Sequence, residues 1–252
     1  MGRFDGRTAL VTGAAGGIGA AIAHRFASEG AAVVCADVDK DGAQRTVGGI
    51  ARAGGAPAAL AVACDVRDES SCADAVAETV TAMGPLHVLA NVAGVGSFRA
   101  TNHLTLDEWN RTLQINLTGT FLMCRHALEP LIATKGAIVN MASIAGLRAT
   151  PYNAAYCASK GGVVMLTKAL AVEFGGVGLR VNCVCPSSVD TPFLRNFRIP
   201  EDADLSLFAR TGSVLARKAT AEEIAGAVAY LASDDAAMVT GTALVVDGGA
   251  TA

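Results

Sequence analysis

Charged residues are scarce in this sequence: Asp, Glu, Lys and Arg make up 17% of its 252 residues, against about 25% in an average globular domain. Disorder requires low hydrophobicity and high charge, and the hydrophobic share of 52% excludes it. The 20 basic and 23 acidic residues give a net charge of −3, and no basic run stands out, so no nucleic-acid partner is expected. No apolar stretch reaches the roughly 18 residues that span a bilayer, so no membrane partner is expected.

The spacings typical of metal and disulfide motifs are also missing. The seven cysteines include no Cys-x-x-Cys pair, and their closest spacing is Cys183-x-Cys185. We therefore expect buried thiols in a reducing compartment. The four histidines lack metal-ligand spacing, so no metal site is expected. The N-terminus has no apolar signal-peptide core, which predicts a cytoplasmic protein.

Short apolar runs alternate with longer helical patterns along the chain. The runs predict strands at 8–12, 32–37, 58–64, 87–91, 137–141, 181–185 and 243–246. The helical patterns cover 20–29, 41–53, 69–83, 106–133, 154–174 and 221–232. Strands that are apolar throughout and alternate with helices indicate a parallel sheet covered on both faces. The predicted fold class is therefore a doubly wound α/β sheet in one domain.

One stretch, residues 187–213, shows neither pattern. A long irregular segment in a compact domain is usually a binding loop or a lid. We expect a substrate lid here, and a disordered surface loop stays open as the alternative. The apolar residues Phe193, Leu194, Phe197 and Phe208 either line the substrate pocket or pack the lid onto the domain.

A glycine-rich turn joins the first strand to the first helix. Gly13, Gly17 and Gly19 follow a G-x-x-x-G-x-G spacing, which permits a tight turn and a close approach of the backbone to a diphosphate. The diphosphate would lie on free N–H groups at the helix N-terminus. There is no Gly-Lys-Ser/Thr motif, which disfavours a phosphate loop for ATP or GTP.

Asp37 ends the second strand, at the position where a carboxylate can accept both ribose hydroxyls of adenosine. It would repel a 2′-phosphate, and neither Ala15 nor Val38 supplies a cation for that group. The pattern favours NAD over NADP. Asp65, after the third strand, can similarly contact the adenine edge.

Tyr156 and Lys160 lie four residues apart in a helical pattern and so share one helix face. A free tyrosine has a pKa of about 10, too high for a base at neutral pH. One cation at about 4 Å contributes roughly 4 kcal/mol at an effective dielectric of 20. We therefore expect Lys160 by itself to lower the pKa of Tyr156 to about 7.

Two further polar residues accompany this pair. Ser143 follows the fifth strand, at the carboxyl edge where such sheets bind ligands, and its hydroxyl can hold a substrate oxygen. Asn116 is an amide within an apolar helical segment. Asparagine competes with the helix for backbone hydrogen bonds, so its presence there suggests a functional role. The alternative is a buried amide whose hydrogen bonds are all made within the protein.

In combination, these residues resemble the classical subgroup of the short-chain dehydrogenase/reductase family. The resemblance covers essentially all 252 residues. It rests on the order Thr12-Gly13-x-x-x-Gly17-x-Gly19, Asp65, Asn91-Val92-Ala93-Gly94, Asn116, Ser143, Tyr156-x-x-x-Lys160, residues 186–191 and Asp247-Gly248-Gly249.

The resemblance implies a Rossmann-type, mostly parallel seven-stranded sheet with helices on both faces, as a single NAD(P)-binding domain over residues 1–252. It implies that Tyr156 is the acid/base, that Lys160 holds the nicotinamide ribose and lowers the pKa of Tyr156, and that Ser143 binds the substrate oxygen. Asn116 would hold a water that links Lys160 to solvent. Besides the glycine turn, Asp37 and the Tyr156–Lys160 pair, the implied coenzyme contacts are Ile18, Asp65, Val66, Asn91, Ala93, Gly94, Pro186, Val189 and Thr191.

Two residues depart from the family's pattern. Val92 replaces a second asparagine, which removes one amide that braces the sheet. Ser187 stands where glycine is usual, near the expected substrate position. We expect the substrate pocket to be lined by mostly small or apolar residues, namely Val95, Ala145, Asn153, Ser187 and Phe193.

The helical segment 154–174 carries only three charges, Lys160, Lys168 and Glu173. A helix that is apolar on most sides is buried on most sides, whereas a sheet covers one face. We therefore expect a homo-oligomer, which agrees with the family, whose members are commonly dimers or tetramers; a homotetramer is the expected form.

The expected function is NAD-dependent interconversion of a secondary alcohol and a ketone by hydride transfer, with a tyrosine as acid/base. One alternative is an NADPH-dependent ketone reductase, such as a 3-oxoacyl-carrier-protein reductase. Another is a non-catalytic dinucleotide sensor on the same fold, against which the intact Ser143, Tyr156 and Lys160 speak.

Overall fold

The centre of the molecule is a parallel sheet. The computed structural model describes residues 2–54, 57–195, 199–208 and 213–252. Within these residues seven strands follow the order β3-β2-β1-β4-β5-β6-β7, and every neighbouring pair is parallel. The strands are β1 (Thr8–Thr12), β2 (Ala32–Asp37), β3 (Ala59–Ala63), β4 (Leu86–Asn91), β5 (Ala137–Met141), β6 (Arg180–Pro186) and β7 (Ala243–Val246). The strand order reverses between β1 and β4, and sheets of this kind bind ligands at the carboxyl ends of such strands.

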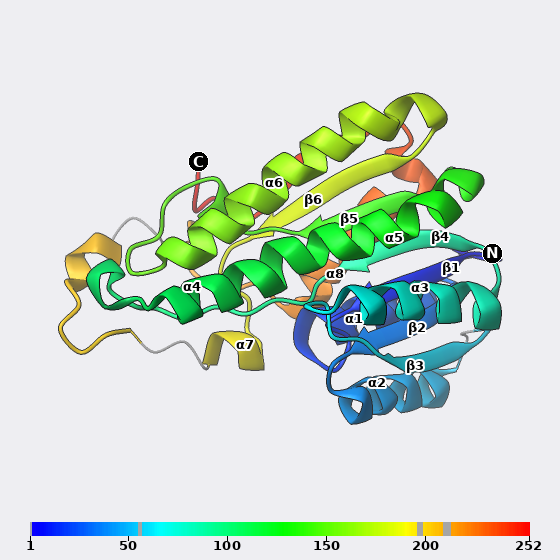
Figure 1. Cartoon of the computed structure of the whole chain (residues 1–252), viewed down its shortest axis with the longest axis horizontal. Helices are drawn as coiled ribbons and strands as arrows, with labels where there is room; N and C mark the ends of the chain where they lie inside the picture. Colours follow the sequence, from blue (N-terminus) through cyan, green and yellow to red (C-terminus); the bar gives the residue numbers. More distant parts are fainter. Residues whose placement is uncertain (1, 55–56, 196–198, 209–212) are drawn as a thin grey trace.

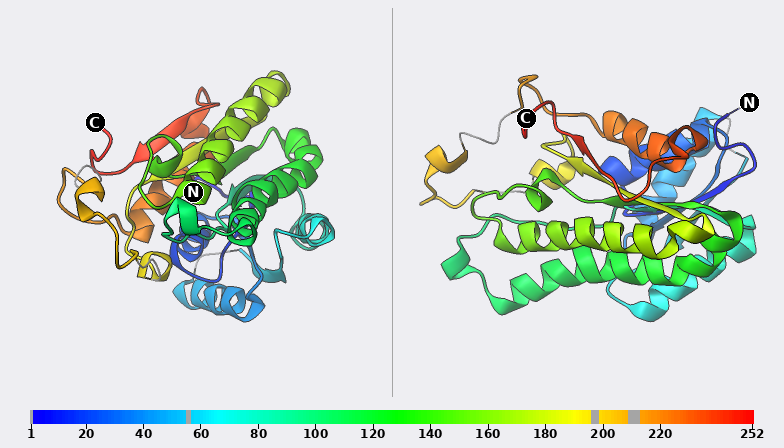
Figure 2. Two further views of the ribbon diagram at one scale, coloured as in Figure 1. Left: turned by 60° about the vertical axis from the view of Figure 1, so that its left-hand side comes forward. Right: turned by 90° about the horizontal axis from the view of Figure 1, so that it is seen from above.

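Helices cover both faces of the sheet, as Figures 1 and 2 show. One core contains side chains of α1 (Gly17–Ser28), α2 (Lys40–Ala53) and α8 (Ala221–Ala232), and the other those of α3 (Glu69–Met83), α5 (Gly119–Thr134) and α6 (Ala154–Phe174). Successive strand residues face opposite sides, so Ala9 and Val11 of β1 enter the first core and Leu10 the second. This confirms the doubly wound α/β class and explains why the strands are apolar throughout.

The long helical segment predicted over 106–133 contains a turn of a different kind. It starts as α4 (Leu106–Leu113), continues through the single π-helical turn η2 (Gln114–Thr118) and ends as α5. Asn116 lies in the middle of the π turn and is fully buried. π turns inside α-helices are frequent at functional sites.

Most predicted bounds agree with the structure. Three helices, α3, α6 and α8, and four strands begin and end at the predicted residues. The start of α1 differs, because the helix begins at Gly17 rather than at residue 20. Glycine is a poor helix former. The N–H groups in the first turn of any helix lack partners within that helix, whatever the residue type, so Gly17 and Gly19 do not prevent α1 from beginning there. The short helices are η1 (Thr101–His103), η3 (Ile144–Gly146), η4 (Gly175–Val177), α7 (Pro192–Arg195), η5 (Leu205–Phe208) and η6 (Asp234–Ala236).

The segment predicted as a lid is described in part. Its described residues include α7 and η5, and residues 196–198 and 209–212, with the prediction for Phe197, lie outside the described residues. Phe208 packs edge-on against Phe98 and stacks on Tyr152, whose hydroxyl accepts a hydrogen bond from the Asp204 N–H at 2.8 Å. These contacts hold η5 against the loops that follow β4 and precede α6. Among the described helices, none is long and apolar enough to cross a membrane.

Candidate active site

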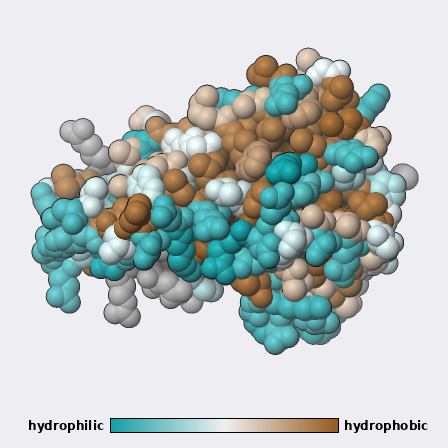
Figure 3. All heavy atoms as spheres, in the orientation of Figure 1, coloured by the Kyte–Doolittle hydropathy of each residue, from teal (hydrophilic) through white to brown (hydrophobic). Residues whose placement is uncertain are grey.

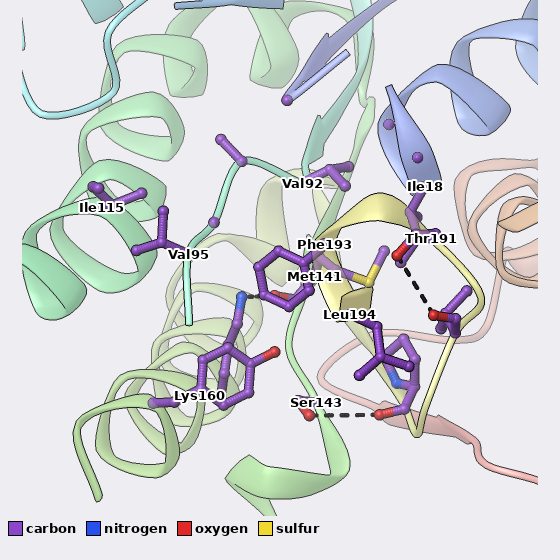
Figure 4. Close-up of a pocket in the computed structure, with 18 of the residues that line it drawn as sticks. Ile18, Val92, Val95, Ile115, Met141, Ser143, Lys160, Thr191, Phe193 and Leu194 are labelled. Atoms are coloured by element: carbon purple, nitrogen blue, oxygen red, sulfur yellow. Dashed lines mark hydrogen bonds between the residues drawn. The ribbon is translucent and has the colours of Figure 1, made fainter. Parts of the chain in front are cut away.

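A cavity of about 860 Å³ runs along the carboxyl edge of the sheet. The turn after β1, the ends of β2 to β6 and the lid segment all contribute to its walls. In Figure 4, Thr191 and Leu194 of the lid segment lie on one side of this space, with Ile115 and Val95 on the other. The cavity therefore occupies the position that the strand order predicts for a ligand.

The glycine turn forms one end of the cavity. Gly13 has φ +69°, and a Cβ built there would lie 2.8 Å from the backbone nitrogen of Ala93. A Cβ at Gly19 would lie 2.0 Å from the carbonyl oxygen of Gly13. Only glycine fits at these two positions, since the turn packs directly against other backbone.

The N-terminus of α1 points its free N–H groups at this space. Side chains of Asp39, Asp68, Thr105 and Thr220 cap α2, α3, α4 and α8. The N-cap of α1, Gly16, provides no side-chain cap, and the first turn of the helix has no acidic residue. Uncapped N–H groups and the positive end of the helix dipole suit an anion. The residues of this turn therefore fit the diphosphate of a dinucleotide.

Asp37 lies beside the same turn. One carboxylate oxygen accepts a hydrogen bond from the Ala15 N–H at 2.9 Å, and the other accepts one from the Asp39 N–H at 2.9 Å. These bonds hold the carboxylate at the wall of the cavity, which Val38 also lines. Two backbone donors thus position an acceptor next to the diphosphate end.

Asp65 also lines the cavity, but its carboxylate is paired with an arginine. The Arg67 guanidinium contacts both carboxylate oxygens, the shortest distance being 2.6 Å. Hydrogen bonds from Arg67 lower the pKa of Asp65. Since the side chain is held this way, its contact with an adenine edge stays a prediction, whereas the neighbouring Val66 is at the wall as expected.

The other end of the cavity holds the predicted catalytic group. Ser143, which follows β5, and Tyr156 of α6 are hydrogen-bonded through their side chains. The Ser143 hydroxyl oxygen also accepts a hydrogen bond from the Ala145 N–H at 3.1 Å. Lys160 donates from Nζ to the Met141 carbonyl at 2.7 Å, and this nitrogen lies 5.7 Å from the centroid of the Tyr156 ring.

Burial controls the titration of both α6 residues. It raises the pKa of Tyr156 to about 12, although the hydrogen bond with Ser143 acts in the opposite direction. It lowers the pKa of Lys160 to about 8. The prediction that Lys160 by itself lowers the pKa of Tyr156 is therefore wrong for the coenzyme-free protein. The ammonium lies over the ring and binds a carbonyl, and the loss of water around the phenol outweighs its field.

Asn116 does not line the cavity but braces its wall. Its Nδ2 donates to the Val95 carbonyl at 2.8 Å and to the Ser159 hydroxyl at 3.0 Å, while its Oδ1 accepts from the Val95 N–H at 2.8 Å. These bonds tie the loop after β4 to α6. A Cβ at Gly94 would lie 3.2 Å from Asn116 Oδ1 and 3.5 Å from Lys160 Nζ, so both polar groups flank this glycine. The water-holding role implied for Asn116 stays a prediction.

Asn91 is absent from the described cavity wall, and its Nδ2 donates to Asn140 Oδ1 at 2.9 Å and to Cys124 Sγ at 3.2 Å. The side chain therefore links β4 to β5 and α5 and is directed away from the ligand space. It still braces the sheet although Val92 lacks the second amide. The coenzyme contact expected at Asn91 stays a prediction.

The other predicted contacts are at the wall. The coenzyme set there comprises Gly13, Gly17, Ile18, Gly19, Asp37, Asp65, Val66, Ala93, Gly94, Tyr156, Lys160, Pro186, Val189 and Thr191. The substrate set comprises Val95, Ala145, Asn153, Ser187 and Phe193. Sequence reasoning missed Phe98, Arg111, Ile115, Thr150, Ile199 and Lys218. Arg111 and Ile115 are four residues apart on the long helical segment, a spacing that could have indicated a shared face.

Comparisons with known proteins show which proteins the chain is similar to. A family model described as enoyl-(acyl carrier protein) reductase matches residues 13–251. D-threitol dehydrogenase of Mycolicibacterium smegmatis is 43% identical over 251 residues, which cover 99% of this chain and 94% of that protein. Meso-2,3-butanediol dehydrogenase of Serratia marcescens is 39% identical, over 99% of this chain and 96% of that protein. Among solved structures, 3-ketoacyl-(acyl-carrier-protein) reductase from Brucella melitensis, complexed with NADH, superposes with a TM-score of 0.89 at 35% identity, covering 99% of this chain and all of that one.

Proposed function

We propose an NAD-dependent reaction for this protein from one premise: the chain belongs to the short-chain dehydrogenase/reductase family and is an oxidoreductase that interconverts secondary alcohols and ketones. One observation carries the proposal. A single cavity has the hydrogen-bonded Ser143 and Tyr156 at one end and the uncapped N-terminus of α1 at the other. This arrangement suits a substrate oxygen at the first end and a dinucleotide along the rest.

The choice of NAD rests on Asp37. Its carboxylate lines the cavity and is held in place by hydrogen bonds from the N–H groups of Ala15 and Asp39. A carboxylate accepts hydrogen bonds from two ribose hydroxyls and repels a 2′-phosphate. Arg67, the cation nearest in sequence at the cavity wall, is already paired with Asp65.

The coenzyme would be held by residues of the cavity wall. Gly13, Gly17, Ile18 and Gly19 would bind the diphosphate, Asp37 the adenosine ribose, and Asp65 and Val66 the adenine. Ala93, Gly94 and Lys160 would face the nicotinamide ribose. Pro186, Val189 and Thr191 would face the nicotinamide, with the Thr191 hydroxyl at the carboxamide.

In the proposed mechanism Tyr156 moves the proton. When bound, the oxidised coenzyme would supply the hydride acceptor and a positively charged ring. Ser143 holds the alcohol oxygen, and Tyr156 Oη takes the hydroxyl proton as the C–H bond breaks. In ketone reduction Tyr156 returns that proton to the oxygen. Positioned acid–base catalysis of this kind contributes about 10² to 10⁴ in rate.

The pKa of Tyr156 indicates which protonation state of its phenol serves ketone reduction and which serves alcohol oxidation. Burial raises the pKa of Tyr156 to about 12, so the phenol carries its proton at neutral pH and is ready to reduce a ketone. Alcohol oxidation requires the tyrosinate, so we expect its rate to rise with pH. Lys160, whose pKa burial lowers to about 8, loses part of its charge over the same range.

Coenzyme titration and turnover test the proposal. NAD and NADP are titrated against the protein by the fluorescence of Trp109, and NADH formation is followed with a panel of secondary alcohols. We expect tighter binding of NAD, and loss of at least about a hundredfold in activity for Tyr156→Phe with NAD binding retained. Tighter binding of NADP would overturn the assignment of Asp37, and full activity of Tyr156→Phe would overturn that of the tyrosine.

A second candidate is a 3-oxoacyl-carrier-protein reductase. The Brucella structure carries that name, and the description of the family model also names a reductase of acyl-carrier-protein substrates, which favours including a 3-oxoacyl thioester in the panel. Oxidation of NADPH with this thioester, together with failure on simple alcohols, would replace the leading proposal. A coenzyme sensor would bind NAD and turn over no substrate of either kind.

We also propose that the protein is a homo-oligomer, most simply a tetramer. On α6 the side chains of Met165 and Val172 are 62% and 87% exposed, and Phe121 on α5 is 42% exposed. Figure 3 shows apolar residues gathered over this part of the surface. A stable monomer in light scattering at micromolar concentration would contradict the proposal.

The proposed location of the protein is the cytoplasm. The seven free cysteines, six of them buried, suit a reducing compartment of this kind. Cell fractionation tests this proposal.

A further inference from the structure

Two phenylalanines from distant segments line the cavity side by side. Phe98 lies in the loop that follows β4, and Phe208 is the last residue of η5 in the lid segment. Their rings pack edge to face, with centroids 5.5 Å apart and an interplanar angle of 89°. The pair therefore gives the cavity two adjoining apolar walls that stand nearly at right angles.

Contacts with neighbouring loops place this pair at the end of the cavity that holds Tyr156. The Phe208 ring stacks on the ring of Tyr152, four residues before Tyr156, with centroids 6.0 Å apart. The residue after Phe98, Arg99, donates its backbone N–H to the Tyr152 carbonyl at 2.6 Å. Both phenylalanines are thus held against the loop that leads into α6, whereas the start of α1 forms the coenzyme end.

The backbone of Tyr152 is strained where it makes these contacts. Its φ is +58°, in the left-handed region that residues other than glycine rarely adopt. Such conformations persist only where surrounding contacts fix them, and they gather at ligand sites. Here the Tyr152 hydroxyl accepts from the Asp204 N–H at 2.8 Å, and the ring packs on Phe208. The contacts that offset the strain are therefore the ones that hold Phe208 at the cavity wall.

The polar side chains at this end offer little to a second hydroxyl of a substrate. Ser143 and Tyr156 are proposed to serve the reacting oxygen. The Ser187 hydroxyl donates to a backbone carbonyl at 3.3 Å, and Asn153 Oδ1 is buried within the protein. Phe193 adds a further apolar wall, with its ring centroid 6.4 Å from that of Tyr156. The surroundings of the reacting carbon are therefore mostly apolar.

We infer that Phe98 and Phe208 select alcohols with an apolar body of about ring size, so that the substrates are cyclic secondary alcohols rather than small alcohols or polyols. The inference rests on the proposed function, because Ser143 and Tyr156 hold the hydroxyl from which that body extends. An apolar body gains free energy as it loses water against apolar walls, and a ring has few rotations to lose. A polyol would lose the water on its hydroxyls without replacement.

Matched alcohols test the apolar character of this end. NADH formation is measured with cyclohexanol, with tetrahydropyran-4-ol, in which an oxygen replaces one CH₂ group, with 2-propanol and with meso-2,3-butanediol. Since each buried CH₂ group contributes about fourfold, we expect kcat/KM for cyclohexanol to exceed that for tetrahydropyran-4-ol at least about fourfold. It should exceed that for 2-propanol, which is three carbons smaller, at least about tenfold. An equal or higher kcat/KM for any of the other three alcohols overturns the inference and leaves the dehydrogenase assignment intact.

Variants of Phe208 test whether this residue carries the preference. In Phe208→Ala, kcat/KM for cyclohexanol should fall about tenfold, while that for 2-propanol, which lacks the ring, stays within about twofold. Phe208→Leu keeps an apolar side chain and should retain most of the preference. Leu207→Ala is the control, because this neighbouring side chain is 53% exposed and is absent from the described cavity wall. The control should keep the preference in full.

The outcomes separate this inference from the proposed function. Equal losses on cyclohexanol and 2-propanol in Phe208→Ala show that the residue only closes the lid, and this overturns the inference. The same loss of preference in Leu207→Ala also overturns it. Failure to form NADH with these and every other alcohol of the panel overturns the proposed function, and the inference with it.

Coenzyme affinity gives a readout besides activity. The dissociation constant of NAD, measured by the fluorescence of Trp109, should stay within about twofold in Phe208→Ala, because other segments form the coenzyme end of the cavity. A tenfold weaker affinity for NAD in this variant would assign Phe208 to the coenzyme and overturn its role in substrate selection.

Discussion

Replacing Lys160 by methionine should stabilise the coenzyme-free protein at neutral pH, although it removes a residue proposed to serve the reaction. The side chain is 4% exposed, and burial lowers its pKa from 10.5 to about 8. Below pH 8 the folded protein therefore holds a buried ammonium that the unfolded chain would solvate. Methionine has a similar length and carries no charge.

The magnitude follows from that pKa. At 1.36 kcal/mol for each tenfold change in a proton equilibrium, a fall from 10.5 to about 8 corresponds to about 3 kcal/mol. The lost hydrogen bond from Nζ to the Met141 carbonyl opposes this by about 1 to 2 kcal/mol. We expect Lys160→Met to raise the free energy of unfolding at pH 7 by about 1 to 2 kcal/mol.

The pH dependence has a definite sign. A lysine whose pKa is lower in the folded state binds fewer protons there than in the unfolded chain between pH 8 and 10.5, so the stability of the unaltered protein rises over that window. The advantage of Lys160→Met should therefore disappear between pH 8 and 10.5, and the variant should be the less stable one at pH 10.5. Tyr156 is present in both proteins, and its pKa near 12 does not affect the difference.

Urea unfolding at one protein concentration, at pH 7 and at pH 10, measures this difference. Lys168→Met, on an exposed lysine of the same helix, is the control and should change stability by less than about 0.5 kcal/mol at either pH. A Lys160→Met variant that is less stable at pH 7, or whose difference from the unaltered protein is independent of pH, would refute the reasoning that burial controls this ammonium.

Three further predictions follow from local geometry. Gly13→Ala should destabilise the fold by about 1 to 3 kcal/mol in urea unfolding, because φ is +69° and a Cβ at this position meets backbone at 2.8 Å. The control is Gly175→Ala, which should be close to neutral because a Cβ there meets nothing within 4 Å. Equal effects of the two substitutions would contradict this prediction. Asn116→Leu should lower the melting temperature by several degrees, since it leaves the polar backbone groups of Val95 unpaired, and an unchanged value would count against the bracing role. A thiol reagent should label at most one cysteine of the native protein quickly, Cys157, and fast labelling of several would show that the buried thiols are accessible.

Much of the architecture could be predicted from the sequence, because the spacing of apolar residues and the residue types found in turns depend only on residues that are near one another in the chain. Continuous apolar runs predict buried parallel strands, and the 154–174 pattern gives α6 with its true bounds. The π turn at Gln114–Thr118 could not be predicted in this way. Its central residue, Asn116, bonds to Val95 and Ser159, which are 21 and 43 residues away in sequence.

In the site, too, sequence spacing predicts some features, whereas others depend on contacts between distant segments. The spacing of Tyr156 and Lys160 correctly predicts a shared helix face, but the Met141 carbonyl decides where the ammonium lies. The family resemblance implies a coenzyme contact at Asn91, but it does not show that the side chain of Asn91 donates to Cys124. Sequence spacing does not reveal a partner contributed by another strand or helix.

Sequence patterns predict the order of strands and helices along the chain, the glycine turn and the set of reactive side chains, since each depends on neighbouring residues. Only folding fixes which of those side chains lose water and which find partners. It made Tyr156 a weaker acid and Lys160 a weaker base, and it left the oxygen of Asn153 without a donor. Desolvation and hydrogen bonding depend on segments far apart in the chain, so they come into being only when the fold brings those segments together.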